Sequence, residues 1–221
     1  MWWCIKPKMF DPEICFDVRT AATKEELLEK IGDLGLVNSY RVGEGRRTSQ
    51  SSEAYCVRRW ILHLADNDQL TYPVSVYHQD SPDFIVVENG FSYGLEVTEA
   101  STKEDGREMA RLEKLEPESP DSELKPTLLG GFGGRGADGF IGDEPLQFVF
   151  QDIQDAIDRK SGKYAQGATI DLLIYPNSNP AFVFSMERDL PRLLRMSFNR
   201  REFRRIFLIW GDETLNQINF G

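Results

Sequence analysis

Two acidic residues lie at matching places on either side of a predicted hairpin. The Asn-Gly pair at residues 89–90 separates two runs of alternating apolar residues. This dipeptide favours a type I′ turn, in which both central residues have positive φ. Counting outward from a two-residue loop places Asp83 opposite Glu96, because turn length fixes the register. We therefore predict an antiparallel pair over residues 82–88 and 91–98, with both carboxylates on one face.

The chemistry of such a pair follows from the short distance between the carboxylates. Paired residues have Cβ atoms about 4.5–5.5 Å apart, so the two like charges repel each other. Either a raised pKa or a bound cation has to compensate. A hard divalent cation such as Mg²⁺ binds carboxylate oxygens, with waters and substrate phosphate as its other ligands. The simpler alternative is that Glu96 lies on a solvated strand face and Asp83 only begins a strand.

The order Pro-Asp at residues 82–83, then Glu-Val-Thr at residues 96–98 on the next strand, resembles the PD-(D/E)xK nuclease superfamily. That superfamily has the restriction-endonuclease-like fold. The resemblance implies that Asp83, Glu96 and the backbone carbonyl of Val97 bind Mg²⁺, or Mn²⁺ in its place. It also implies a lysine two residues after the glutamate, which helps to activate the attacking water. This sequence departs from the pattern there, because Thr98 occupies that position and carries no charge.

Some members of the superfamily carry this lysine on the following helix, and Lys160 suits that role. It lies seven residues after Ile153 and three after Ile157, on the apolar stripe expected to face the sheet. Arg159 is turned about 100° away from the stripe. Lys163 follows a glycine at which the helix is expected to end. The ordinary alternative for Lys160 is a lysine at the edge of the core whose stem covers apolar surface.

The resemblance therefore implies a Mg²⁺-dependent endonuclease, a hydrolase of phosphodiester bonds, with DNA favoured as the substrate. Its catalytic residues would be Asp83, Glu96 and Lys160. The alternative is a non-catalytic binding module of the same fold that acts within a protein complex, which Thr98 and the net charge of −10 favour. A protein partner or a homodimer stays open, and we expect no membrane partner.

The contacts with nucleic acid are expected at clusters of arginine. Positive charge is concentrated near the C-terminus, and a further pair lies on a predicted helix. The residues proposed to bind nucleic acid are Arg58, Arg59, Arg200, Arg201, Arg204 and Arg205. The alternative is an amphipathic helix whose charged face is simply solvated.

The elements that must position these residues are predicted from hydrophobic periodicity. Thr23 and Glu26 have capping-box spacing ahead of a first helix. Residues 42–52 are predicted to form a loop. Apolar spacing predicts a second helix through Val57, Trp60, Ile61 and Leu64, then a strand from Leu70 to Val76 ahead of the hairpin. Beyond the hairpin we predict a helix from Phe148, a strand at 169–178, a helix at 186–203 that Pro191 breaks or starts, and a strand at 204–211.

This order predicts an α/β protein with a mixed central sheet flanked by helices, of restriction-endonuclease-like fold in view of the resemblance. Residues 1–51 are interpreted as an N-terminal extension with a helix. Residues 52–221 form the predicted domain. A charged and glycine-rich insertion at about 101–145 is expected to lie outside the sheet and to be mobile, because it has little apolar surface to bury.

Composition sets limits on the class of protein. The chain has 221 residues, of which 40% are hydrophobic, so a sizeable core is within reach. No apolar run approaches the roughly 18 residues that a membrane span needs, and the first ten residues do not read as a signal peptide. The three cysteines have no CxxC spacing, which argues against a structural zinc site and favours a reducing compartment. We expect a cytoplasmic protein.

Overall fold

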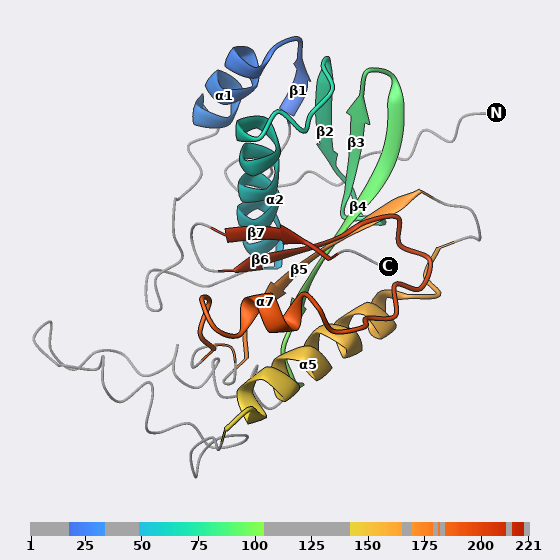
Figure 1. Ribbon diagram of the computed structural model, residues 1–221. Coiled ribbons are helices and arrows are strands. Elements are labelled where there is room, and N and C mark those ends of the chain that lie inside the picture. Colours follow the sequence, from blue (N-terminus) through green and yellow to red (C-terminus); the bar gives the residue numbers. More distant parts are fainter. Residues whose placement is uncertain are drawn as a thin grey trace, which may run out of the picture. The chain divides into compact units, whose positions relative to one another are not determined.

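The computed structural model describes residues 18–33, 49–103, 142–164, 169–178, 181, 184–210 and 214–218 (Figure 1). The first ten residues, the predicted loop up to residue 48 and most of the predicted insertion, 104–141, lie outside the described residues.

Within the described residues the chain has an α/β fold with four helices and one mixed sheet of seven strands. The helices are α1 (Lys24–Asp33), α2 (Ser49–Asp66), α5 (Glu144–Lys160) and α7 (Leu190–Leu193). The strands are β1 (Val18–Ala21), β2 (Val74–His78), β3 (Phe84–Glu88), β4 (Phe91–Ala100), β5 (Ile170–Pro176), β6 (Ile206–Trp210) and β7 (Thr214–Gln217). Each strand is hydrogen-bonded to its neighbours in the sequence. None of the described helices is both long and apolar enough to cross a membrane.

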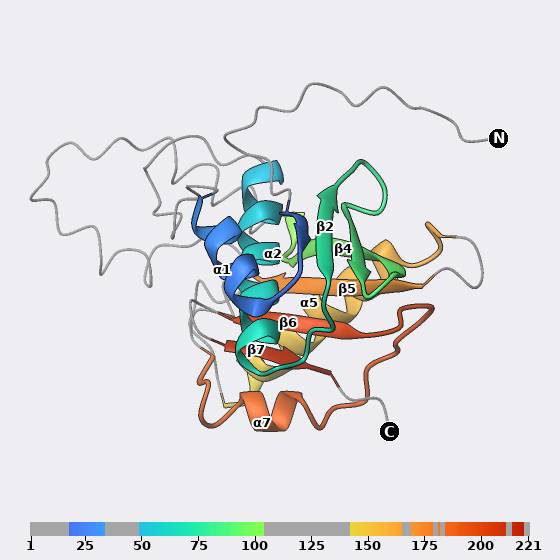
Figure 2. The ribbon, with the colours of Figure 1, turned by 90° about the horizontal axis from the view of Figure 1, so that it is seen from above.

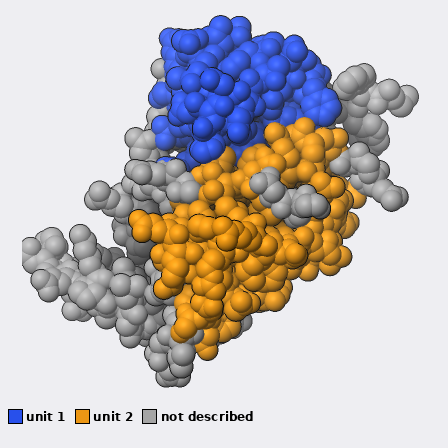
Figure 3. All heavy atoms as spheres, in the orientation of Figure 1, with its two compact units in different colours: residues 1–40, 47–95 blue, residues 41–46, 96–221 orange. Residues whose placement is uncertain are grey.

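The chain divides into two compact units, coloured separately in Figure 3. The first contains Met1–Tyr40 and Arg47–Leu95, and the second contains Arg41–Arg46 and Glu96–Gly221. The boundary falls inside β4, between Leu95 and Glu96. Glu96 therefore belongs to the same unit as α5, β5 and β6.

The first unit contains the hairpin that the Asn-Gly pair predicts. Asn89 and Gly90 have φ angles of 45° and 82°, as a type I′ turn requires. The ladder pairs Glu88 with Phe91 and continues to Phe84 with Leu95, so the predicted register is confirmed over these five pairs. The inward side chains are buried, as expected: Phe84, Val86, Tyr93 and Leu95.

The helices of the first unit follow the predicted caps and stripes. Thr23 Oγ1 accepts the backbone N–H of Glu26, and the Glu26 carboxylate accepts the backbone N–H of Ala22. These two bonds are the capping box expected at this end of α1. The predicted stripe of α2 is fully buried: Val57, Trp60, Ile61 and Leu64. The helix begins at Ser49, earlier than the apolar pattern indicates.

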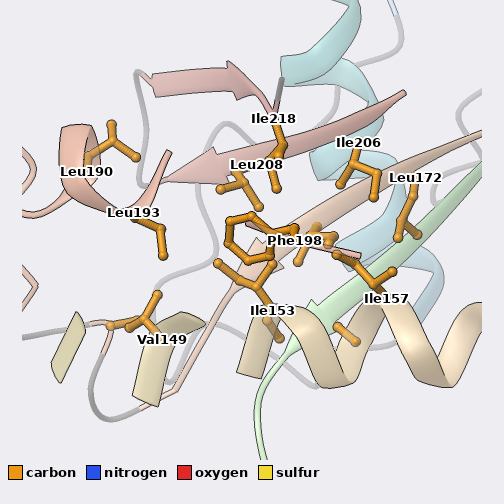
Figure 4. Packing of buried hydrophobic residues seen from close by; sticks show 14 of the residues in the cluster. Val149, Ile153, Ile157, Leu172, Leu190, Leu193, Phe198, Ile206, Leu208 and Ile218 are labelled. Atoms are coloured by element: carbon orange, nitrogen blue, oxygen red, sulfur yellow. The ribbon is translucent and has the colours of Figure 1, made fainter. Parts of the chain in front are cut away.

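The second unit is built on strands β5 and β6, which are parallel, with Leu172 opposite Ile206. Helix α5 packs against β5 and runs along one face of these strands (Figure 2). Its buried side chains recur at helical spacing, including Val149, Ile153 and Ile157. Figure 4 shows these residues pointing toward Leu172, Leu208 and Phe198 in one apolar cluster. The apolar stripe thus fixes the rotation of α5 about its axis.

The predicted helix at 186–203 is wrong in its extent. Only Leu190–Leu193 is helical, starting next to Pro191. The helix ends in tight turns, in which the backbone N–H groups of Arg195 and Met196 donate to the carbonyls three residues earlier at 3.2 and 3.0 Å, and farther along Arg201 has a φ of 57°. Neither arrangement is compatible with continued helix.

Three strand assignments also differ from the sequence patterns. The strand predicted from Leu70 begins at Val74, after Pro73, which has no N–H to donate to a ladder. Strands β1 and β7 were not predicted. Each is four residues long and carries polar residues, so alternation alone gives too weak a signal.

The turn yields a prediction with a matched control. Gly90→Ala should lower the free energy of unfolding by about 1 kcal/mol, because a Cβ disfavours the left-handed conformation even where it meets no atom within 4 Å. Gly32→Ala, at an open helical site in α1, should instead raise it by about 0.5–1 kcal/mol. Urea unfolding measures the free energy of unfolding of both variants. Destabilisation of equal size in the two variants would contradict the assigned turn.

Candidate active site around Glu96

Glu96 is a buried carboxylate in the middle of a strand. Its residue surface is 2% exposed, between Leu95 and Val97 on β4. Lys160 and Lys163 both donate through Nζ to its Oε1, Lys163 at 3.3 Å. The hydroxyl of Tyr164 donates to Oε2. The solvated-face alternative for Glu96 is therefore wrong, because the side chain lies inside the second unit among three donors.

Helix α5 brings Lys160 to this carboxylate. The lysine is the last residue of the helix and continues the stripe that contains Ile153 and Ile157. Its side chain is 17% exposed, so the stem is covered while the ammonium reaches Glu96. The sequence prediction that Lys160 faces the strand bearing Glu96 agrees with this contact.

A turn beyond α5 brings two further side chains to the same carboxylate. Gly162 has a φ of 75°, a conformation common just past the C-terminus of a helix. The backbone N–H of Gly162 donates to the Glu202 carboxylate, and Ser161 Oγ donates to the carbonyl of Asp158 at 2.7 Å. These bonds fix the turn, so that Lys163 and Tyr164 lie against Glu96.

The donors keep Glu96 ionised. Burial by itself raises the pKa of this carboxyl group. The hydrogen bonds from Lys160 and Tyr164, together with the positive charges of Lys160 and Lys163, act in the opposite direction and prevail. The pKa of Glu96 therefore lies below its usual value. The result is a carboxylate anion inside the protein, with ammonium groups beside it.

The other predicted ligands have different surroundings. Val97 is buried next to Glu96. Asp83 is half-buried in the first unit, immediately before β3, and its backbone carbonyl accepts the N–H of Gln79 at 2.9 Å. The ladder between β3 and β4 ends at Phe84 and Leu95, so the pairing of Asp83 with Glu96 stays a prediction. Among the described residues, no three His, Cys, Asp or Glu side chains gather as a ready-made metal site.

Thr98, at the usual lysine position, is buried and donates weakly to the carbonyl of Glu99 at 3.5 Å. The positive charge near Glu96 comes instead from α5 and the following turn. Tyr164 was not predicted as a site residue. The signal was present in the sequence as Lys-Ser-Gly-Lys-Tyr at 160–164, because a glycine just past a helix end reverses the chain.

No protein-family model, curated protein or solved structure matches this chain. The function therefore has to be inferred from the contacts around Glu96 and from the charges near it.

Several of the predicted nucleic-acid-binding arginines are held by acidic partners. Arg204 and Arg205 both bind the fully buried Asp171, at 2.7 and 2.6 Å. Arg201 binds Asp158 at 2.7 Å. In the first unit, Arg59 lies over the ring of Tyr55, 5.8 Å from its centroid. Arg58 is half-buried and Arg200 is exposed. Arg204 and Arg205 thus have a structural role in addition to any contact with nucleic acid.

The ionisation of Glu96 leads to a prediction about pH. Because its pKa is lower in the folded than in the unfolded protein, the carboxylate stabilises the fold above the pH at which an unfolded glutamate titrates. That stabilisation should be lost as the pH falls through the lower, folded-state pKa. The difference in unfolding free energy between wild type and Glu96→Gln, measured in urea at several pH values, should therefore shrink on acidification. A difference that grows instead would contradict the assignment.

The Asp171 cluster gives a second prediction, on stability. Asp171→Asn removes the charge that two guanidinium groups share in the interior, and should lower the unfolding free energy by about 3 kcal/mol. Asp158→Asn is the matched control, because its pair with Arg201 is partly exposed and should contribute less than about 1 kcal/mol. Equal losses in the two variants would mean that Asp171 does not anchor β5 to the arginines.

Proposed function

We propose that this protein is a Mg²⁺-dependent nuclease of restriction-endonuclease-like fold, related to the PD-(D/E)xK superfamily, that cleaves phosphodiester bonds in DNA. The observation that carries the proposal is the contact between the buried Glu96 carboxylate and Lys160. The sequence resemblance implies a lysine near the glutamate, Thr98 does not provide it, and a lysine from the next helix does.

The residues at Glu96 fit a hard divalent cation. An ionised carboxylate is a ligand that Mg²⁺ prefers, and Mg²⁺ usually takes only one or two carboxylates beside waters and substrate phosphate. A carboxylate has about four acceptor positions, and three donors use Glu96 in the structure. We propose Glu96, the Val97 carbonyl and Asp83 as protein ligands, with Asp83 assigned from the hairpin register. Mn²⁺ accepts the same oxygen ligands.

Each residue then has a distinct task. Mg²⁺ held by these residues would lower the pKa of a coordinated water and polarise the phosphate of the substrate. Glu96 contributes the negative charge that holds the cation in place. Lys160 orients the attacking water and stabilises the negative charge that develops on the phosphate oxygens. Tyr164 positions the carboxylate through its bond to Oε2, which fixes the direction in which Oε1 points.

A binding module without catalytic activity is the second candidate. Three donors on one carboxylate are also what a structural ion pair needs, and buried charges are ordinarily paired in this way. The net charge of −10 also opposes general attraction to nucleic acid. In this case a protein partner, or a second copy of the chain, would cover the surface near Glu96.

Cleavage assays with matched variants test the proposal. Glu96→Gln should abolish Mg²⁺-dependent cleavage of DNA, and Lys160→Met should lower it by roughly two orders of magnitude, about what a positioned acid–base group contributes. Methionine keeps the length of the stem and removes the charge. Lys24→Met, at a surface pair in the first unit, is the control and should cleave like wild type. Single- and double-stranded DNA and RNA serve as substrates, with Mg²⁺ and with Mn²⁺.

Two outcomes would contradict this assignment. If Lys160→Met cleaves like wild type while Lys163→Met does not, the lysine is misassigned. If the wild type binds no Mg²⁺ by calorimetry and cleaves no nucleic acid, the nuclease proposal fails and the binding module replaces it.

A further inference from the structure

The positive charges beside Glu96 outnumber its single negative charge. One carboxylate faces two ammonium groups, and both donate to the same oxygen, Oε1. Like charges that share one oxygen repel each other, and the repulsion is strong where little water screens it. A divalent cation bound to the same carboxylate adds further positive charge. Withdrawal of one of the two lysines therefore favours binding of the cation.

The two lysines differ in how firmly they are held. Lys160 belongs to the last turn of α5, whose apolar stripe is packed in the core, and its side chain is 17% exposed. Lys163 lies beyond the helix, its side chain is 47% exposed, and its contact with Oε1 is the longer one, at 3.3 Å. A side chain with this exposure can rotate into solvent without opening the core. Lys163 is thus the donor that is more easily released.

Hydrogen bonds hold the backbone of the turn just before Lys163. Gly162 is held by the Glu202 carboxylate, and the N–H of Ser161 donates to the carbonyl of Ile157 at 3.0 Å. The backbone just before Lys163 is therefore held in place, while the lysine side chain can rotate between acceptors within its reach. An anionic oxygen of a substrate that occupies the site is such an acceptor.

We propose that Lys163 is an exchangeable counter-ion of Glu96. It neutralises the carboxylate in the free protein, leaves it when Glu96 takes a divalent cation, and then binds a phosphate oxygen of the nucleic acid. This role rests on the proposed nuclease function and adds the coupling of cation binding to substrate binding. Lys160 stays at the carboxylate throughout.

The experiment measures binding of labelled DNA to the full chain at several salt concentrations, with Ca²⁺ and with a chelator. Ca²⁺ takes the same kind of oxygen ligands as Mg²⁺. In Ca²⁺, Lys163→Met should weaken DNA binding several-fold. The plot of log K against log salt concentration should also become less steep, by about 0.9 for duplex DNA or about 0.7 for single-stranded DNA, as expected for one lost phosphate contact. With the chelator, the variant and the wild type should have the same slope, because Lys163 of the wild type is then bound to Glu96 and contacts no phosphate.

Two further variants test whether the positive charge at residue 163 is itself responsible. Lys163→Arg keeps the charge and should restore the slope in Ca²⁺. Arg159→Met removes a neighbouring exposed charge, whose guanidinium donates to the carbonyl of Glu99 at 2.8 Å, and its effect should be the same with and without Ca²⁺. Thermal unfolding checks that each variant is folded.

The outcomes separate the exchange from the nuclease function. If Lys163→Met changes the slope equally with Ca²⁺ and with chelator, or changes it in neither, the exchange is wrong while wild-type cleavage can still support the nuclease. If Lys160→Met shows the Ca²⁺-dependent change instead, the roles of the two lysines are reversed and the proposal fails. If the wild type binds no divalent cation by calorimetry, both the nuclease function and the exchange are overturned.

Discussion

The buried charge of Glu96 is the constraint on which the second unit depends. A carboxylate removed from water is strongly destabilising unless hydrogen bonds and opposite charges replace the lost hydration. The protein meets this requirement with Lys160, Lys163 and Tyr164, which all come from one short stretch at the end of α5. The apolar packing of α5 on β5 therefore also determines where the three donors to Glu96 lie.

A second buried carboxylate in the same unit shows a different solution to the same problem. Asp171 on β5 is fully buried and accepts two N–H bonds from each of two arginines in the segment just before β6. Guanidinium groups match the geometry of a carboxylate and cannot lose their charge, so this cluster is suited to permanent structure. The ammonium groups at Glu96 are point charges on flexible stems. That difference in side-chain chemistry separates the anchor at Asp171 from the exchangeable contact that we propose for Lys163.

Local features of the sequence predicted much of the fold. The Asn-Gly pair determined the hairpin register, and apolar stripes located α2 and α5, because these signals depend on residues close together in the chain. The place of Lys160 on the sheet-facing stripe was predicted in the same way, from its phase on the helix. The short strands β1 and β7 were missed because their pairing partners, rather than their own residues, determine them. The end of α7 was missed because the apolar spacing continues to Phe198, while the backbone turns after Leu193 and the N–H of Asn199 donates to Gln154 of α5. Tyr164 depends on a turn whose glycine was interpreted only as a helix stop.

The contact between Lys160 and Glu96 joins residues 64 positions apart in the chain. The two residues lie on separate elements, β4 and α5, and each is positioned by its own element. The lysine must share the phase of the buried stripe and must lie in the last turn of α5, because each residue along a helix moves a side chain by about 1.5 Å. Neither condition specifies how many residues separate Glu96 from Lys160. Relatives that share this contact would therefore be recognised by helical phase and strand position, and not by a linear motif.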